Sequence, residues 1–262
     1  RKKIKRKNIQ KKRKIIKSKK NKNTELIYKT KSDWIKKAII NKSGYEKKYS
    51  DSIKNNDNFW KKEGKRITWI KPYTKIKDYK YSKTDVNIKW FYDGTLNASV
   101  NCIDRHLKKN KDKTAIIWVG DDPKVQKKIS YKQLHQEVSK AANGLKEIGV
   151  KKGDRVTIYL TMIPELAYTM LACARIGAVH SIIFGGFSAD SITGRINDCK
   201  SDYVITADEG VRGGKIIDLK ATVDEALLNC PNVKKCIVVK RTGNRINWDE
   251  SRDVWYHDIT KK

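Results

Sequence analysis

The apolar residues of the chain follow two different periods beyond Lys113. Short apolar runs, each of the length of a buried strand, occupy residues 115–119, 156–160, 179–184, 203–206 and 236–239. Between most of these runs, apolar residues recur every three or four positions, which predicts helices. Strands that alternate with helices favour right-handed βαβ units. The pattern therefore predicts an α/β fold with a doubly wound, mostly parallel sheet.

The clearest predicted helix ends at Gly149. Its apolar residues are spaced by four, three, four and three positions: Leu134, Val138, Ala141, Leu145 and Ile148. Glycine directly after such a series is typical of a helix C-terminus. The next helix is predicted to begin at Pro164, where no amide hydrogen is needed, and to end at Gly177.

The first hundred residues show a weaker pattern. Helical spacing occurs around Tyr45, Tyr49 and Ile53, and an extended stretch runs up to Pro72, which disfavours helix at the preceding residue. Asn97 is predicted to cap a helix, because a short side-chain acceptor satisfies the first free amides. We expect a helical and extended N-terminal segment over residues 24–97, followed by an α/β subdomain over residues 98–262 that continues beyond the chain.

Charge is concentrated at the N-terminus. The chain has 60 Lys and Arg against 29 Asp and Glu, a formal net charge of +31, and residues 1–22 hold 14 basic side chains and no acid. Self-repulsion in such a tract predicts a disordered tail over residues 1–23. The tract could bind nucleic acid or anionic lipid through its charge. Lys outnumbers Arg by 48 to 12, however, which favours compositional drift over a nucleic-acid surface.

Cysteine usage and hydropathy indicate an intracellular protein, and we expect it in the cytoplasm. The five cysteines are scattered without a CxxC pair or nearby His, so we expect buried, reduced thiols and no metal site. No window approaches the 18 or so apolar residues of a membrane helix. Because residue 1 is Arg and the chain ends on Lys262, we also expect that both ends are cut from a longer protein.

Two glycine-rich segments follow predicted strands, where ligands bind in doubly wound sheets. The first, residues 185–188, leads into a helix that Ser188 could cap; either an anion site or a plain tight turn explains it. In the second, Arg212 and Lys215 flank Gly213 and Gly214, so two cations and several amides could bind one polyanion. The alternative is a solvated loop in which the two cations pair with the acids of residues 208–209.

Other candidates are weaker. The four histidines are not grouped with one another or with a Ser or Cys in a nucleophilic arrangement: His106, His135, His180 and His257. The tryptophans of the basic half could stack on single-stranded nucleic acid, but their neighbours are apolar and packing is the better interpretation: Trp60, Trp69 and Trp90.

At this point the sequence resembles the AMP-forming acetyl-coenzyme A synthetases of the adenylate-forming superfamily. The resemblance runs from about Tyr45 to the end of the chain. It is carried by FWKKEGKRITWIKPYTKIKD (59–78), IKWFYDGTLNASVNCIDRHL (88–107), the long stretch 162–215 that ends in ITADEGVRGGK, and RDVWYHD (252–258). GVKKGDRV (149–156) is shared by the wider superfamily, whereas ITADEGVRGGK and WFYDGTLN are specific to the synthetases.

The resemblance implies a ligation in two steps. Acetate and ATP form acetyl-AMP and pyrophosphate, and the thiol of coenzyme A then displaces AMP. It further implies that Gly186, Arg212, Gly213, Gly214 and Lys215 contact coenzyme A, and that 98–262 is the first subdomain of the adenylate-forming fold. A propionyl- or other short-chain acyl-CoA synthetase, a basic nucleic-acid-binding protein and an inactive remnant remain alternatives. The resemblance also implies a loop for the ATP phosphates, an acetate pocket, a Mg²⁺ site and a catalytic Lys. This chain contains none of these. We therefore assign no catalytic residue and expect the chain alone to be inactive.

Overall fold

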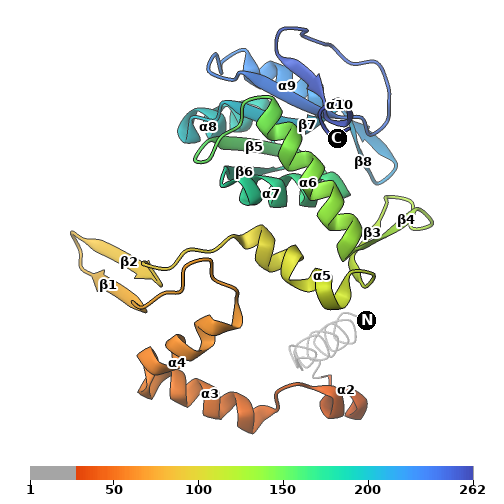
Figure 1. The fold of residues 1–262 in the computed structure, drawn as a ribbon. Coiled ribbons are helices and arrows are strands. Elements are labelled where there is room, and N and C mark those ends of the chain that lie inside the picture. Colours follow the sequence, from red (N-terminus) through yellow and green to blue (C-terminus); the bar gives the residue numbers. More distant parts are fainter. Residues whose placement is uncertain (1–27, 262) are drawn as a thin grey trace, which may run out of the picture. The chain divides into compact units, whose positions relative to one another are not determined.

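The computed structural model describes residues 28–261, and the tail expected over residues 1–23 lies outside the described residues. Two compact units make up the chain, Arg1–Phe59 and Trp60–Lys262. In the first unit, α2 (Ser32–Lys37) is followed by α3 (Lys42–Lys54), and α4 (Asn56–Glu63) begins there and crosses into the second unit (Figure 1). The Asn41 side chain caps α3 by accepting the Gly44 amide at 2.9 Å, which confirms a helix around Tyr45.

The second unit begins with an aromatic cluster. A 3-10 turn, η1 (Gly64–Arg66), precedes an antiparallel hairpin of β1 (Lys77–Tyr81) and β2 (Val86–Trp90). Trp69, Tyr73 and Phe91 pack with ring centroids 4.5–5.7 Å apart, so Trp69 serves packing as predicted. The carboxylate of Asp93 accepts the Thr74 amide at 3.0 Å and thereby closes this segment.

Asn97 joins this segment to the α/β part. Its side-chain Oδ1 accepts the Val100 amide at 3.2 Å, as expected of a helix cap, and its side-chain Nδ2 donates to the carbonyls of Ala174 and Arg175. The helix that follows contains a π-turn, η2 (Val100–Asp104), and continues as α5 (Arg105–Asn110).

The core is a five-stranded parallel sheet in the order β11-β10-β7-β5-β6, which confirms the predicted fold class. Its strands are β5 (Arg155–Leu160), β6 (Val179–Phe184), β7 (Tyr203–Ala207), β10 (Lys235–Val239) and β11 (Asp253–Trp255). β5 and β7, in the middle, are almost fully buried, as their continuous apolar runs predict.

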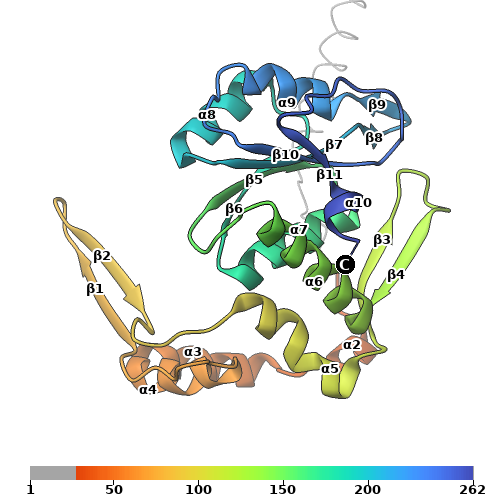
Figure 2. The same cartoon turned by 45° about the horizontal axis from the view of Figure 1, so that its top comes forward.

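Helices cover both faces of this sheet. Figure 2 shows α8 (Ala189–Cys199) and α9 (Leu219–Leu227) on one face, and α6 (Tyr131–Glu147), α7 (Pro164–Ile176) and α10 (Tyr256–Ile259) on the other. Ser130 begins α6 with a capping box, and Gly177 ends α7 at a φ of +77°. The helix boundaries at Gly149, Pro164 and Gly177 are therefore confirmed.

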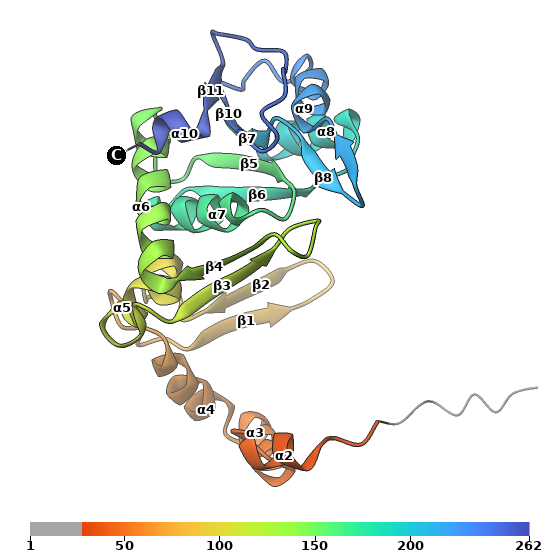
Figure 3. The ribbon, with the colours of Figure 1, turned by 90° about the vertical axis from the view of Figure 1, so that its right-hand side faces the viewer.

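The predicted strand at residues 115–119 does not join the sheet. It forms β3 (Thr114–Val119), which pairs antiparallel with β4 (Gln126–Ser130) as a separate hairpin (Figure 3). The connection between them is a short loop, residues 120–125, which Gly120 closes by donating its amide to the Val125 carbonyl at 2.7 Å. Six residues allow a hairpin but are too few for the crossover that a parallel neighbour requires.

Candidate binding site at the carboxyl edge of the sheet

The chain leaves adjacent strands β5 and β7 toward opposite faces of the sheet. β5 continues into α7 on one face, and β7 continues toward α9 on the other (Figure 2). A reversal of this kind opens a crevice at the carboxyl ends of the strands, where ligands bind in doubly wound folds. A cavity of about 210 Å³ lies there, lined among others by Trp118, Thr161, Met162, Val211 and Arg241.

The glycine-rich turn after β6 is held by a buried tyrosine. Gly186, at a φ of +120°, donates its amide to the Tyr159 hydroxyl at 3.1 Å, and this hydroxyl donates to the Phe187 carbonyl at 3.0 Å. Ser188 caps α8 by accepting the Ser191 amide, as predicted. A Cβ at Gly186 would meet nothing within 4 Å, so the space beside this backbone is open.

The second glycine-rich segment is a β-hairpin rather than an irregular loop. β8 (Gly210–Arg212) pairs with β9 (Lys215–Ile217), and Gly213 and Gly214 form the turn with φ of +59° and +74°. Positive φ at both central residues is what a type I′ turn requires, which accounts for two glycines in succession.

This hairpin places its two cations together and beside the first turn. Arg212 and Lys215 are directly opposite each other in the register, so their side chains lie on the same face of the ribbon. The Arg212 guanidinium lies 6.0 Å from the centroid of the Phe184 ring, at the end of β6 next to the turn that contains Gly186. The residues singled out in the sequence thus come from neighbouring segments of one edge.

The turn amides are already hydrogen-bonded. Gly213 donates to Asp121 Oδ1 at 2.7 Å and Gly214 donates to Asp121 Oδ2 at 2.8 Å. The expectation that backbone amides of this segment join the cations in binding an anion is therefore wrong for these two groups. A carboxylate of the β3–β4 connection takes the position that an anion would occupy.

The alternative, in which the acids of residues 208–209 pair with Arg212 and Lys215, is also wrong. Asp208 is buried and accepts the amides of Arg241 and Gly243, each at 2.8 Å. Glu209 accepts the Thr242 hydroxyl and the Asn244 side-chain amide instead. Within residues 28–261, neither Arg212 nor Lys215 has an ion-pair partner, so both charges stay available to a ligand.

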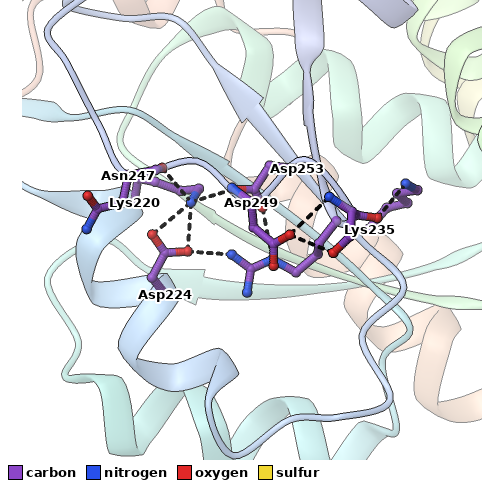
Figure 4. A network of polar contacts seen from close by, with 8 residues as sticks. Lys220, Asp224, Lys235, Asn247, Asp249 and Asp253 are labelled. Carbon is purple, nitrogen blue, oxygen red and sulfur yellow. Dashed lines mark hydrogen bonds and ion pairs between the residues drawn. The ribbon is translucent and has the colours of Figure 1, made fainter.

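The acids of residues 208–209 instead fix the loop after β10, and a buried ionic network fixes its far end. The Lys220 ammonium contacts both carboxylate oxygens of Asp224 at 2.7 and 2.8 Å, Asp253 at 2.8 Å and the Asn247 carbonyl at 3.1 Å (Figure 4). Burial alone would lower the pKa of Lys220, but the hydrogen bonds to Asp224 and Asp253 outweigh it and raise that pKa. The lysine stays charged and anchors the loop.

The remaining candidates are scattered. His135 lies 3.4 Å from Asp104, and His106 packs on the ring of Tyr131. All five cysteines are free, but only three are buried: Cys102 is exposed and Cys199 is half-buried, which corrects the expectation of uniform burial. Burial raises the pKa of the Cys236 thiol to about 12, so this thiol is not a nucleophile.

Over residues 28–261, no group of three or more His, Cys, Asp or Glu side chains is arranged to hold a metal ion. In the same range, no helix has both the length and the apolar character to cross a membrane.

The sequence did not predict Asp121 or Tyr159 as residues of the site. Asp121 lies more than 90 residues before the turn that it contacts, and local spacing carries no signal of such a pairing. Tyr159 is one residue of a continuous apolar strand, and at such a position the sequence does not distinguish a tyrosine that only packs from one that also forms hydrogen bonds. Two adjacent acids shortly after the predicted strand at residues 115–119, Asp121 and Asp122, are the one local hint of such a role.

The chain is similar to known proteins over most of its length. Residues 103–260 match the family of AMP-binding enzymes, and residues 45–102 match the acetyl-coenzyme A synthetase N-terminus. Acetyl-coenzyme A synthetases of Parvibaculum lavamentivorans and Shewanella frigidimarina are 59% and 56% identical to the chain, over 90% and 89% of its length. The chain spans only 36% of the length of each of these two relatives.

A solved structure agrees at the level of the fold. The acetoacetyl-CoA synthetase from Streptomyces lividans superposes with a TM-score of 0.74 at 24% identity, over 84% of this chain and 33% of that one. Because the AMP-binding match covers more than half of the 262 residues, the chain belongs to the AMP-binding enzyme family.

Proposed function

We propose that this chain supplies the coenzyme A-binding part of an AMP-forming acetate–CoA ligase of the cytoplasm. One observation carries the proposal: Arg212 and Lys215 lie opposite each other on a glycine-turned hairpin, unpaired among the described residues, at the carboxyl edge of the sheet. Two cations at this spacing suit a ligand with several phosphate charges. The relatives named acetyl-coenzyme A synthetase give the ligand class.

The chemistry of the ligation explains why such a site is needed. A free carboxylate is a poor electrophile, and adenylation by ATP gives it AMP as a leaving group. The thiol of coenzyme A must then be brought to the acyl-AMP, and binding the distant nucleotide end of coenzyme A makes the attack effectively intramolecular. In this proposal Arg212 and Lys215 bind the phosphates, Gly213 and Gly214 form the turn, and Gly186 leaves room for the ligand.

The proposal assigns no catalytic residue to this chain. Mg²⁺ would be expected to bind with the ATP phosphates, but the residues 28–261 offer no cluster of acids that fits it, and no step is derived through it. We therefore expect no acetyl-CoA from the chain alone with ATP, acetate and coenzyme A. The division into a basic tail, an N-terminal segment over residues 24–97 and an α/β subdomain over residues 98–262 is part of the same proposal.

Calorimetric titration of the chain tests the binding role. We expect coenzyme A to bind more tightly than dephospho-coenzyme A, because the latter lacks the 3′-phosphate that the two cations would contact. Equal affinities, or no binding of either, would refute the proposal. Titration with single-stranded DNA at two salt concentrations addresses the rival function: steeply salt-dependent DNA binding without coenzyme A binding would favour a nucleic-acid-binding protein.

A further inference from the structure

The tip of the β3–β4 hairpin and the turn of the β8–β9 hairpin are joined by one side chain. Asp121 accepts one glycine amide with each of its carboxylate oxygens, at 2.7 and 2.8 Å. Hydrogen bonds to a charged acceptor are among the stronger ones in proteins, and the bidentate arrangement also fixes the direction of the turn. Among the described residues, Asp121 is the side chain that hydrogen-bonds the Gly213–Gly214 turn.

Asp121 is presented by a segment that is itself well held. The indole of Trp118 donates to the Met162 carbonyl at 2.7 Å, which ties β3 to the end of β5. Gly120 donates to the Val125 carbonyl at 2.7 Å and closes the connection on the other side of the aspartate. The carboxylate therefore has a defined place relative to the sheet.

The turn end of the β8–β9 hairpin, in contrast, has few contacts of its own to hold it in place. The hairpin consists of three residue pairs, and its turn glycines, Lys215 and Ile216 are exposed. A two-stranded hairpin of this size is at best marginally stable by itself. The base of the hairpin is anchored, because Gly210 is buried, Val211 lines the cavity and Ile217 packs against the core, but none of these residues belongs to the turn. The position of Arg212 and Lys215 consequently depends on what holds the turn.

We propose that Asp121 is a positioning residue of the coenzyme site: it holds the Gly213–Gly214 turn so that Arg212 and Lys215 face the ligand together. Because its carboxylate already occupies the amides of the turn, the phosphates of the ligand are met by side chains and not by backbone. The tip of the β3–β4 hairpin thereby becomes part of the site. This inference rests on the proposed coenzyme A-binding role.

Positioning and electrostatics make opposite predictions for Asp121. A carboxylate near an anion site repels the ligand. If Asp121 acted only through its charge, its removal would strengthen binding of coenzyme A. If Asp121 positions the hairpin, the same removal weakens binding, because the two cations lose their fixed geometry. The sign of the change therefore separates the two explanations.

The experiment compares D121N and D121A with the matched control D122N in calorimetric titrations of the chain with coenzyme A. Asp122 is the adjacent residue, and its carboxylate caps only the Lys124 amide within the same turn, at 2.9 Å. We expect D121A to weaken binding about tenfold, the effect of losing charge-assisted hydrogen bonds. D121N, which retains one acceptor oxygen, should weaken it less, and D122N should not weaken it. Binding by D121A as tight as that of D122N would overturn the inference.

Hydrogen exchange supplies a readout that does not need the ligand. The chain has 15 glycines, so ¹⁵N-glycine labelling resolves the amides of Gly213 and Gly214 in a simple spectrum. Their exchange should be faster in D121N and D121A and unchanged in D122N, at melting temperatures that differ little among the variants. Unchanged exchange in D121A would overturn the inference. A wild-type chain that binds no coenzyme A would refute the proposed function and with it the positioning role, whereas faster exchange would still show that Asp121 holds the turn.

Discussion

The ammonium of Lys220 lies 2.8 Å from the carboxylate of Asp253, and the two side chains are 1% and 0% exposed. Arg252 extends the pair by donating to Asp253 and Asp224 at 2.9 and 2.7 Å. The network ties α9 to β11 and, through the Asn247 carbonyl, to the loop after β10 that borders the cavity. The network therefore stabilises the loop that borders the candidate site.

Removing one partner of this pair should be costly. We expect D253A to lower the free energy of unfolding by about 3–5 kcal/mol, because it leaves the buried charge of Lys220 undercompensated. Urea denaturation measures the change. E250Q, which removes an exposed acid three residues away, should change it by less than about 0.5 kcal/mol. A D253A variant as stable as E250Q would show that the pair contributes nothing.

Two helical glycines should respond to alanine with opposite signs. A Cβ at Gly144 of α6 would overlap the Ile259 carbonyl oxygen at the contact with α10, so G144A should destabilise the protein. A Cβ at Gly194 of α8 would meet nothing within 4 Å, and G194A should stabilise the helix by about 0.5–1 kcal/mol. Thermal denaturation of the two variants gives the comparison. The same sign for both would mean that the close approach of α6 and α10 is not a constraint.

Arg212 should determine affinity for coenzyme A. We expect R212A to raise the dissociation constant roughly tenfold to a hundredfold, since a charge-assisted hydrogen bond contributes about 1.5–3 kcal/mol. R245A removes an equal charge from the border of a separate cavity, beside Asp218 and Asn247, and should leave the affinity nearly unchanged. Equal effects of R212A and R245A would indicate that only overall charge attracts the ligand.

Asp93 should remain ionised well into acid. Hydrogen bonds from the Thr74 hydroxyl and the Lys75 amide lower the pKa of Asp93 from its ordinary value of 3.8 to about 2. Because the folded-state pKa is the lower one, the carboxylate contributes stability above pH 3.8, and this contribution is lost as the pH falls toward 2.

Carboxyl NMR of the chain between pH 5 and about 2 measures the midpoint directly. The T74A variant, which lacks the hydroxyl donor, should shift the midpoint upward toward 3.8. A wild-type midpoint already at 3.8 would contradict the hydrogen-bonded arrangement of Asp93 with Thr74 and Lys75.

Most regular elements of the α/β part were predictable from local sequence. The helix α6 follows from the spacing of Leu134, Val138 and Leu145, and all three side chains are buried. The limits of α7 follow from Pro164 and Gly177, because the missing amide of proline and the positive φ of glycine are properties of single residues. Long-range packing has little influence on such signals.

The pairing of strands was less predictable. The apolar run of β3 resembles that of β5, yet Ile117 and Val119 of β3 are largely exposed, whereas β5 is buried almost throughout. Run length and apolar content report that a strand forms, but the identity of its neighbour depends on the connection that follows. The turn at Gly120 is what directs β3 to β4.

The sequence by itself determined the fold class, the main helix boundaries and the choice of Gly186, Arg212 and Lys215 as candidate residues, because periodicity, single-residue backbone preferences and family motifs are local. Only the tertiary structure decided that Asp208 holds the loop after β10 instead of pairing with Arg212, and that Asp121 takes the amides of the glycine turn. These contacts join residues far apart in the chain, so the fold, and not the spacing along the sequence, brings donor and acceptor within hydrogen-bonding distance.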